Sequence, residues 1–159
     1  MIIHKLKQGS LKTNLYILEK ENSILIIDCP SDNNNDIKII SEIIENKQII
    51  GIIYTHNHFD HIAGGHKFEN IKQVMHSKDI DTINEQIKLG KLFNYPNLKL
   101  PKNIENIENK NKDIFYPFNF EILHTPGHSG GSICILFEKE KIIFTGDTIF
   151  KNHIGRTDI

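Results

Sequence analysis

Residues 56–61 of the chain read His-Asn-His-Phe-Asp-His. They follow a largely apolar segment, residues 49–55, whose composition is typical of a strand buried on both faces. Three imidazoles and a carboxylate within six residues, at the end of such a strand, form a metal-ligand arrangement. His56 and His58 are two residues apart, so both can point the same way from an extended loop. The stretch therefore predicts a metal site built from His56, His58, Asp60 and His61.

Strands and helices alternate on both sides of this stretch. Short apolar runs predict further strands at residues 1–7, 13–19, 23–28, 71–76, 118–123, 132–138 and 141–144. Apolar residues at helical spacing predict a helix after the polar loop 31–36, and a second helix is expected at about 77–92. Residues 103–112 are polar and Asn-rich and are expected to be a surface excursion. This pattern predicts an α/β (or α+β) sandwich in one domain, residues 1–159.

Three further segments carry a resemblance to a known family. The hexapeptide 56–61 resembles the H-x-H-x-D-H signature of the metallo-β-lactamase superfamily. Downstream, TPGHS supplies His128 and TGDT supplies Asp147, in the order that the family has them. Upstream, ILIIDCP places Asp28 where the family has a supporting aspartate at a strand end. The resemblance covers nearly the whole chain and implies an αββα sandwich.

The resemblance also implies a site for two metals, expected to be zinc, with iron or mixed metals as alternatives. It implies a first metal held by His56, His58 and His128, a second held by Asp60 and His61, and Asp147 bridging the two. Metals so placed lower the pKa of bound water to near 7, and the resulting hydroxide is the nucleophile. Asp60 is expected to act in catalysis as well, because it would orient that hydroxide. Glycines at 127 and 146 are expected to allow the tight turns that aim His128 and Asp147.

Family members continue through a helix and a strand to a last histidine that completes the second metal site. Nothing in this sequence matches that histidine, so the resemblance predicts a domain incomplete at its C-terminus, lacking its final strand and helix. It also predicts that the second metal binds more weakly than the first, because loss of an outer-shell partner alone typically costs about 10–100-fold in metal affinity.

The branch of the family is indicated by residues 146–158, GDTIFKNHIGRTD. This segment resembles the glyoxalase-II-like branch and its persulfide dioxygenase relatives. The resemblance implies hydrolysis of thioesters such as hydroxyacylglutathione, a small-molecule substrate. Arg156 is expected either to bind a substrate carboxylate or to pair with Asp158. Two alternatives stay open: a mononuclear iron persulfide dioxygenase, and a metal-binding remnant without activity.

Composition excludes other classes of partner. The net charge of -1 argues against a nucleic-acid or membrane-surface partner, and the longest apolar runs are too short to cross a membrane. Cys29 and Cys134 are expected to be free thiols, which favours a cytoplasmic protein. The oligomeric state stays open. The remaining histidines are expected to pack, cap or face solvent: His4, His66, His76, His124 and His153.

Overall fold

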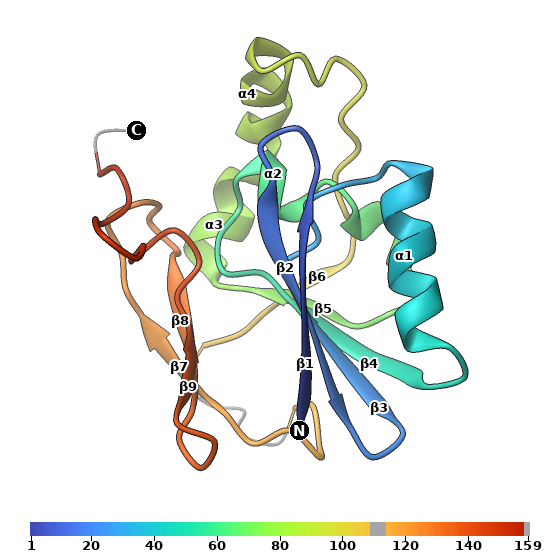
Figure 1. Cartoon of the computed structure of the whole chain (residues 1–159). Coiled ribbons are helices and arrows are strands. Elements are labelled where there is room, and N and C mark those ends of the chain that lie inside the picture. The colour runs from blue at the N-terminus through green and yellow to red at the C-terminus, as the bar shows by residue number, and fades with distance from the viewer. Residues whose placement is uncertain (109–113, 158–159) are drawn as a thin grey trace.

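The computed structural model describes residues 1–108 and 114–157, whose strands form two sheets (Figure 1). The larger sheet has the order β1-β2-β3-β4-β5-β6, antiparallel from β1 to β3 and parallel from β3 to β6. Its strands are β1 (Ile2–Gln8), β2 (Thr13–Lys20), β3 (Ser23–Ile27), β4 (Gln48–Ile53), β5 (Gln73–Met75) and β6 (Ile104–Asn106). The smaller sheet is antiparallel and consists of β7 (Glu121–His124), β8 (Ile133–Phe137) and β9 (Ile142–Phe144).

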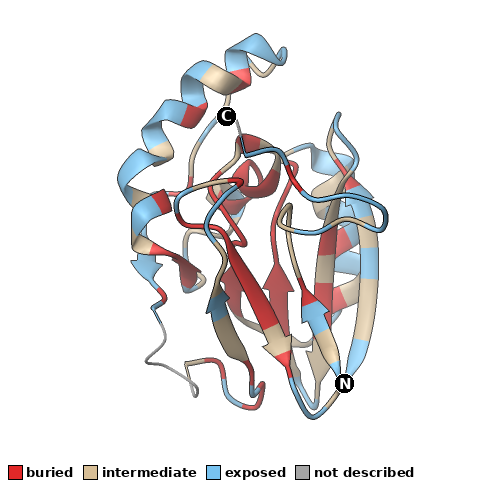
Figure 2. Ribbon diagram, turned by 90° about the vertical axis from the view of Figure 1, so that its left-hand side faces the viewer, coloured by how far each residue is buried: buried red, intermediate tan, exposed pale blue. Residues whose placement is uncertain are grey.

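Side chains along β3 point alternately to the two faces of the larger sheet, and the core is divided into two layers accordingly. Leu25 and Ile27 point into a cluster with Phe120, Phe137 and other side chains of the smaller sheet. The intervening residues of β3 point to the opposite face of the sheet, because successive side chains of a strand alternate. The first layer therefore joins the two sheets face to face. Strands β3 and β8 are buried over most of their length, and Figure 2 shows buried strands at the centre of the molecule.

Helix α1 (Asn34–Ile44) covers the opposite face of the larger sheet. The side chain of Asn33 caps its first turn by accepting a hydrogen bond from the Asn35 backbone N–H at 2.8 Å. Ile40 and Ile44, four residues apart, are buried against the apolar layer below. The helix expected after the polar loop and the layered α/β architecture are thus confirmed.

The helix expected over residues 77–92 is not continuous. It is divided into α3 (Ser77–Thr82), a 3₁₀ turn (Ile83–Glu85) and α4 (Gln86–Leu92). The run Asp81-Thr82-Ile83-Asn84 at the junction has low helix propensity. Thr82 itself leaves helical geometry, with φ -105° and ψ 3°. The break redirects α4 across the end of the larger sheet, where it packs against the helical turn Phe59–Ile62 (Figure 1).

The prediction that residues 103–112 form a surface excursion was partly wrong. Residues 104–106 form β6, which pairs in parallel with β5, and Ile107 after it is buried. An apolar residue on each side of Glu105-Asn106 fits an edge strand better than a free loop. The end of that prediction, residues 109–112, lies outside the described residues.

Both cysteines are free and buried, as expected. Burial first, and then the charge of Asp28, raise the pKa of the Cys29 thiol far above its ordinary value, so it stays protonated. In the part of the chain that the structure describes, no helix has the length and apolar character needed to cross a membrane.

Candidate metal centre

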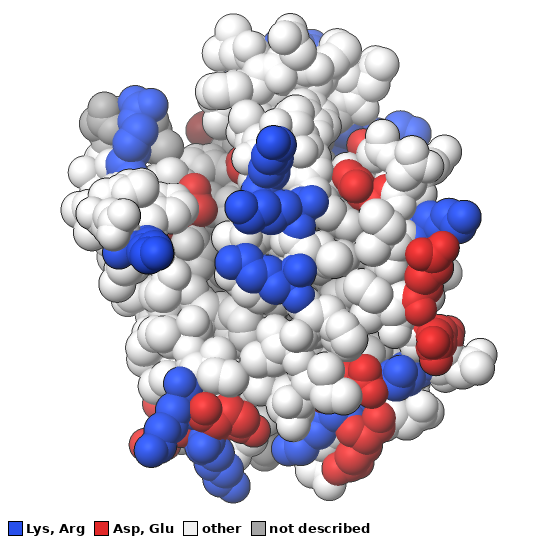
Figure 3. Space-filling view, viewed as in Figure 1, with Lys and Arg blue, Asp and Glu red and all other residues white. Residues whose placement is uncertain are grey.

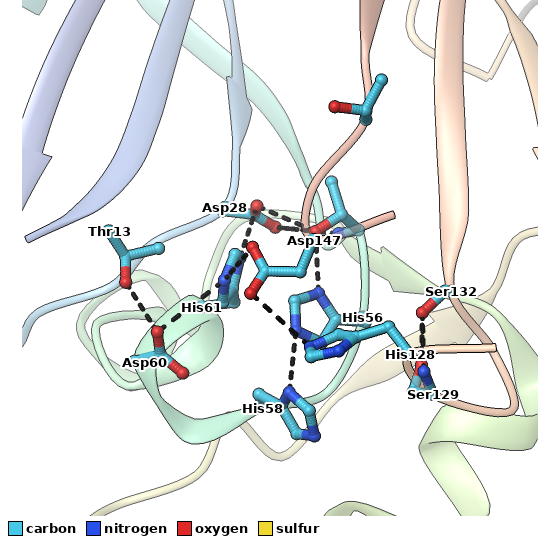
Figure 4. A network of polar contacts seen from close by, with 12 residues as sticks. Thr13, Asp28, His56, His58, Asp60, His61, His128, Ser129, Ser132 and Asp147 are labelled. Atoms are coloured by element: carbon cyan, nitrogen blue, oxygen red, sulfur yellow. Dashed lines mark hydrogen bonds and ion pairs between the residues drawn. The ribbon is translucent and has the colours of Figure 1, made fainter. Parts of the chain in front are cut away.

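The residues singled out by the motifs meet at one end of the two sheets (Figure 4). The loop after β4 carries His56 and His58, and the short helix α2 (Phe59–Ile62) carries Asp60 and His61. The loop between β7 and β8 contributes His128, and the loop after β9 contributes Asp147. Elements from both sheets therefore converge on the predicted site.

Three histidine side chains form one compact group. The Nε2 atom of His56 lies 3.0 Å from Nδ1 of His58. Ligand atoms of His56, His58 and His128 all lie within 4.8 Å of one another. Two nitrogens on one tetrahedral zinc, each bonded at about 2.0–2.1 Å, would be about 3.3 Å apart. The group therefore has the dimensions of a three-histidine metal site.

A second group places Asp147 between two histidines. Its Oδ1 lies 3.4 Å from Nε2 of His61, and its Oδ2 lies 3.5 Å from Nε2 of His128. Ligand atoms of His56, His61 and Asp147 also lie within 4.8 Å of one another. The carboxylate thus faces both halves of the centre, which is the arrangement required of a bridging ligand.

Asp60 lies at the edge of the centre. One of its oxygens is 3.8 Å from Nε2 of His61, and the same oxygen accepts a hydrogen bond from the Thr13 hydroxyl at 2.6 Å. Thr13 begins β2, and nothing in the sequence marks it as part of the site. The structure therefore adds a residue that fixes the orientation of the Asp60 carboxylate.

Asp28 holds the base of the centre from the end of β3. This buried carboxylate accepts hydrogen bonds from His61 Nδ1 at 2.8 Å and from the Thr55 backbone N–H at 2.8 Å. Because Nδ1 of His61 donates to Asp28, its Nε2 is left as the atom that faces Asp147. The backbone of Asp28 is left-handed, with φ 59°, a strained conformation of the kind found at functional sites. The supporting role expected for Asp28 matches its contacts.

The other histidines are oriented in a similar way. Nδ1 of His128 donates to the backbone carbonyl of Arg156 at 2.9 Å, which leaves Nε2 facing Asp147. Nδ1 of His56 lies 3.1 Å from the Thr55 hydroxyl, which itself contacts Asp28. Gly146 has φ +49°, and a Cβ there would lie 2.5 Å from the Thr55 hydroxyl oxygen. The turn before Asp147 therefore requires glycine, as expected.

Burial and mutual proximity keep two of these imidazoles neutral. Burial, followed by the neighbouring histidines, lowers the pKa of His56 well below its ordinary value. Burial and then His128 lower the pKa of His58 to about 4. Burial also disfavours protonated His61, but Asp28 and Asp147 outweigh it and hold the pKa of His61 well above its ordinary value. At neutral pH, His56 and His58 thus offer lone pairs, and His61 forms an ion pair with Asp147.

This electrostatic arrangement predicts acid sensitivity of the metal-free protein. The unfolded chain protonates His58 near its ordinary pKa of 6.5, whereas the folded chain does so only near 4. Folded protein thus binds fewer protons between these values, and stability falls as the pH drops from 6.5 to 4. His61 does not oppose this decline. Its pKa is raised in the folded protein, so its contribution to the free energy of unfolding is already complete below the pKa that it has in the unfolded chain. Urea unfolding at several pH values should show a loss of about 3 kcal/mol from this group.

The His58→Ala variant is the matched control for that experiment. It removes the titrating imidazole, so the decline in unfolding free energy between pH 6.5 and 4 should be shallower than in the parent chain. Equal slopes of the unfolding free energy against pH in the two metal-free proteins would show that His58 does not cause the decline.

Asp79 on α3 is a supporting residue that sequence reasoning missed. Its carboxylate is 1% exposed and accepts hydrogen bonds from the backbone N–H groups of Asn57 at 2.9 Å and Gly131 at 2.7 Å. It also accepts one from the Ser129 hydroxyl at 2.7 Å. A Cβ on Gly131 would lie 2.6 Å from the Asp79 carboxyl carbon, so the loop packs directly on this carboxylate. Asp79 therefore ties the loop that holds His128 to the loop that holds His56 and His58.

Replacing Asp79 by alanine should destabilise the metal-free protein by about 3 kcal/mol or more, because two buried backbone N–H groups and one part-buried hydroxyl lose their acceptor. Metal affinity should fall about 10-fold, since both ligand loops lose their common support. Urea unfolding and a metal titration measure the two effects. The control is Asp81→Asn, an exposed aspartate on the same helix. Stability and affinity equal to those of the control would show that Asp79 has no positioning role.

Comparison with known proteins finds a matching family, sequence relatives and solved structures of the same fold. The family described as the metallo-beta-lactamase superfamily matches residues 9–159. "Probable metallo-hydrolase MJ0888" of Methanocaldococcus jannaschii is 34% identical over 99% of this chain and 77% of its own length. "Hydroxyacylglutathione hydrolase GloC" of Haemophilus influenzae is 32% identical over 89% of this chain and 68% of its own length.

A solved structure agrees with these sequence relatives. The crystal structure of BLEG-1 B3 metallo-beta-lactamase matches with a TM-score of 0.84 and 27% identity, covering 99% of this chain and 78% of that one. The family and its relatives support a metal-dependent hydrolase function in general terms. With the matched sequence, the shared fold and the cluster of histidines and aspartates all in agreement, this chain belongs to the metallo-beta-lactamase superfamily.

Proposed function

We propose that this chain, as a single domain over residues 1–159, is a metal-dependent hydrolase of small-molecule thioesters, with zinc as its metal. Its ligands are proposed to be His56, His58 and His128 for a first metal, Asp60 and His61 for a second, and Asp147 between them. The observation that carries the proposal is the convergence of three imidazoles on one point, with a carboxylate beside them.

An unpartnered buried nitrogen supports the presence of a metal. Nε2 of His128 is buried and has no hydrogen-bond partner among the described residues. A buried polar atom without a partner is costly, and such atoms are rare in folded proteins. Nε2 of His56 and Nδ1 of His58 are neutral and closely spaced, so a cation between them and His128 would use all three lone pairs. The residues present therefore fit a bound metal.

When bound, the metal supplies a nucleophile at neutral pH by lowering the pKa of water to near 7, and it polarises the substrate carbonyl. The residues of the chain hold and orient the reacting groups. Asp28 fixes the tautomer of His61, and Thr13 fixes the carboxylate of Asp60. Asp60 lines two cavities next to the centre, so its carboxylate can accept a hydrogen bond from the attacking water and hold it toward the substrate.

The proposal of a thioester substrate rests on similarity to a relative and on the motif that indicates the branch of the family. The GloC relative, 32% identical, is named a hydroxyacylglutathione hydrolase. The motif GDTIFKNHIGRTD at residues 146–158 resembles that branch, and its described part supplies a ligand loop. Arg156 lines one of the two cavities at the centre, although Asp158, its expected pairing partner, lies outside the described residues. A glutathione thioester is therefore the first substrate to test.

The experiment is a hydrolysis assay with S-lactoylglutathione on protein depleted of metal by a chelator and then titrated with zinc or iron. Turnover should be absent in the depleted protein and should return with added zinc. Activity that survives complete metal removal would contradict the proposal. One tightly bound iron per chain with no hydrolysis of any thioester would favour the persulfide dioxygenase alternative instead.

A further inference from the structure

A cavity of about 620 Å³ opens directly beside the proposed metal site. His58, Asp60 and His128 line its inner end. Its outer wall is formed by α4 and by the turn between β1 and β2. This volume lies within the usual range of small-molecule sites, about 300–1,000 Å³. A substrate whose reacting bond lies over the metal site can therefore extend into this cavity.

The outer wall of the cavity, which also includes Glu85 and Lys88, carries several exposed apolar side chains. Leu92 is 80% exposed, Phe93 is 50% exposed and Leu11 is 49% exposed, and all three line this one cavity. Leu89, three residues before Leu92 and on the same side of the helix, lines it as well. Large apolar side chains gathered around one opening mark a binding surface rather than scattered surface residues.

The wall is anchored to the metal-binding loop. On the buried side of α4, the side-chain carbonyl of Gln86 accepts a hydrogen bond from the Phe59 backbone N–H at 3.1 Å. The Phe93 ring packs on the Phe59 ring with centroids 5.6 Å apart. Phe59 lies between His58 and Asp60 in the chain, so α4 is held in a set position relative to the ligands. This helix therefore presents its apolar side chains at a defined distance from the reacting centre.

The other side of Asp60 has the opposite character. A second cavity, of about 590 Å³, is lined by Lys5, Lys12 and Lys151 and also contains Asp60 and Leu11. Figure 3 shows basic side chains, which are lysines in this segment, gathered over the middle of the face formed by β1 and β2. Asp60 and Leu11 thus stand where an apolar cavity meets a basic one.

From this asymmetry we infer that the preferred substrate is a thioester of an apolar acyl chain with an acidic thiol. This inference rests on the thioester hydrolase function proposed above. The acyl chain lies against Leu89, Leu92 and Phe93, and the acidic thiol portion lies toward the lysines. Water adds to the acyl carbon, and the C–S bond breaks with its electron pair going to sulfur. The thiolate takes up a proton from the water, and the products are a carboxylic acid and a thiol.

The test compares octanoyl and acetyl thioesters of 3-mercaptopropionic acid on the zinc-loaded chain. The octanoyl thioester should have a kcat/KM about 100-fold higher, since each methylene in an apolar pocket contributes strongly to discrimination. Leu92→Ser should lower this octanoyl-to-acetyl ratio about 10-fold. The matched control is Ile39→Ser, an apolar residue 41% exposed on α1, which should leave the ratio unchanged. A ratio near one in the parent chain, or a ratio insensitive to Leu92→Ser, overturns the inference.

A binding measurement separates this inference from the proposed function. The S-octyl and S-ethyl thioethers of 3-mercaptopropionic acid cannot be hydrolysed. Calorimetry with these compounds therefore measures binding to the cavity without turnover. The S-octyl compound should bind at least about 10-fold more tightly, and Leu92→Ser should remove the difference. If these binding differences are found but no thioester is hydrolysed, the inference that the cavity binds an apolar chain is supported and the hydrolase proposal is overturned. Equal affinities for both thioethers would overturn the inference whatever the turnover.

Discussion

Replacing His128 by alanine is expected to lower the affinity for the first metal at least 100-fold. Loss of an outer-shell partner typically costs 10–100-fold in metal affinity, and His128 is proposed as a direct ligand. Its Nε2 is buried, has no hydrogen-bond partner among the described residues and belongs to the three-histidine group. The metal bound per chain after gel filtration, measured by mass spectrometry, should fall correspondingly. The gain in melting temperature on adding zinc should also disappear, because a ligand that binds the folded state stabilises it.

His4→Ala is the control for this variant. His4 lies on β1, where its imidazole contacts Glu19 at 3.4 Å, and it belongs to neither group of ligand atoms. Its replacement should leave metal content and the zinc-dependent rise in melting temperature unchanged. If His128→Ala retained as much metal as His4→Ala, the ligand assignment would be wrong.

The Asp60→Asn variant should lose about 100-fold or more in kcat while the protein stays folded. Asparagine keeps the shape of the side chain and a carbonyl oxygen that can accept from Thr13, so the local packing survives. It removes the negative charge that is proposed to bind the second metal and to hold the attacking water. Thioester turnover should be measured on samples whose metal content is determined in parallel.

Thr13 provides a graded comparison for Asp60. Thr13→Val removes the hydroxyl that donates to Asp60 at 2.6 Å, and we expect a loss of about 10-fold in kcat. Thr13→Ser keeps the hydroxyl and should retain most of the activity. Near-normal turnover in Asp60→Asn would exclude the role assigned to this carboxylate, and equal rates for the two Thr13 variants would exclude its positioning by Thr13.

The parts of the structure that the sequence predicted well are those in which neighbours along the chain carry the information. The short Ile-rich run at residues 23–28 predicted β3, and the hexapeptide 56–61 placed three histidines and an aspartate together. The proximity of His128 and Asp147 to that hexapeptide came from resemblance to a family. No local pattern connects residues so far apart in the chain, and the structure brings a ligand atom of each within 4.8 Å of ligand atoms of the hexapeptide.

What the sequence did not predict depends on contacts between distant segments. Asp79 looks like any helix aspartate in sequence, yet its carboxylate is buried against Asn57 and Gly131. The break before α4 follows from weak propensity and is stabilised by Gln86 reaching back to Phe59. Leu92 ends the helix expected at about 77–92, and no local pattern predicted that Leu92 and Phe93 would be exposed beside the metal centre. The apolar cavity beside the metal centre therefore had no local signal in the sequence.

The central claim is that His56, His58 and His128 hold a metal at the meeting point of the two sheets. The most direct measurement is a crystal structure of the zinc-loaded chain, with the anomalous difference map collected at the zinc edge. A strong peak is expected at about 2.0–2.1 Å from Nε2 of His56, Nδ1 of His58 and Nε2 of His128. A map in which zinc lies elsewhere, with these three nitrogens bound to no metal, would contradict it.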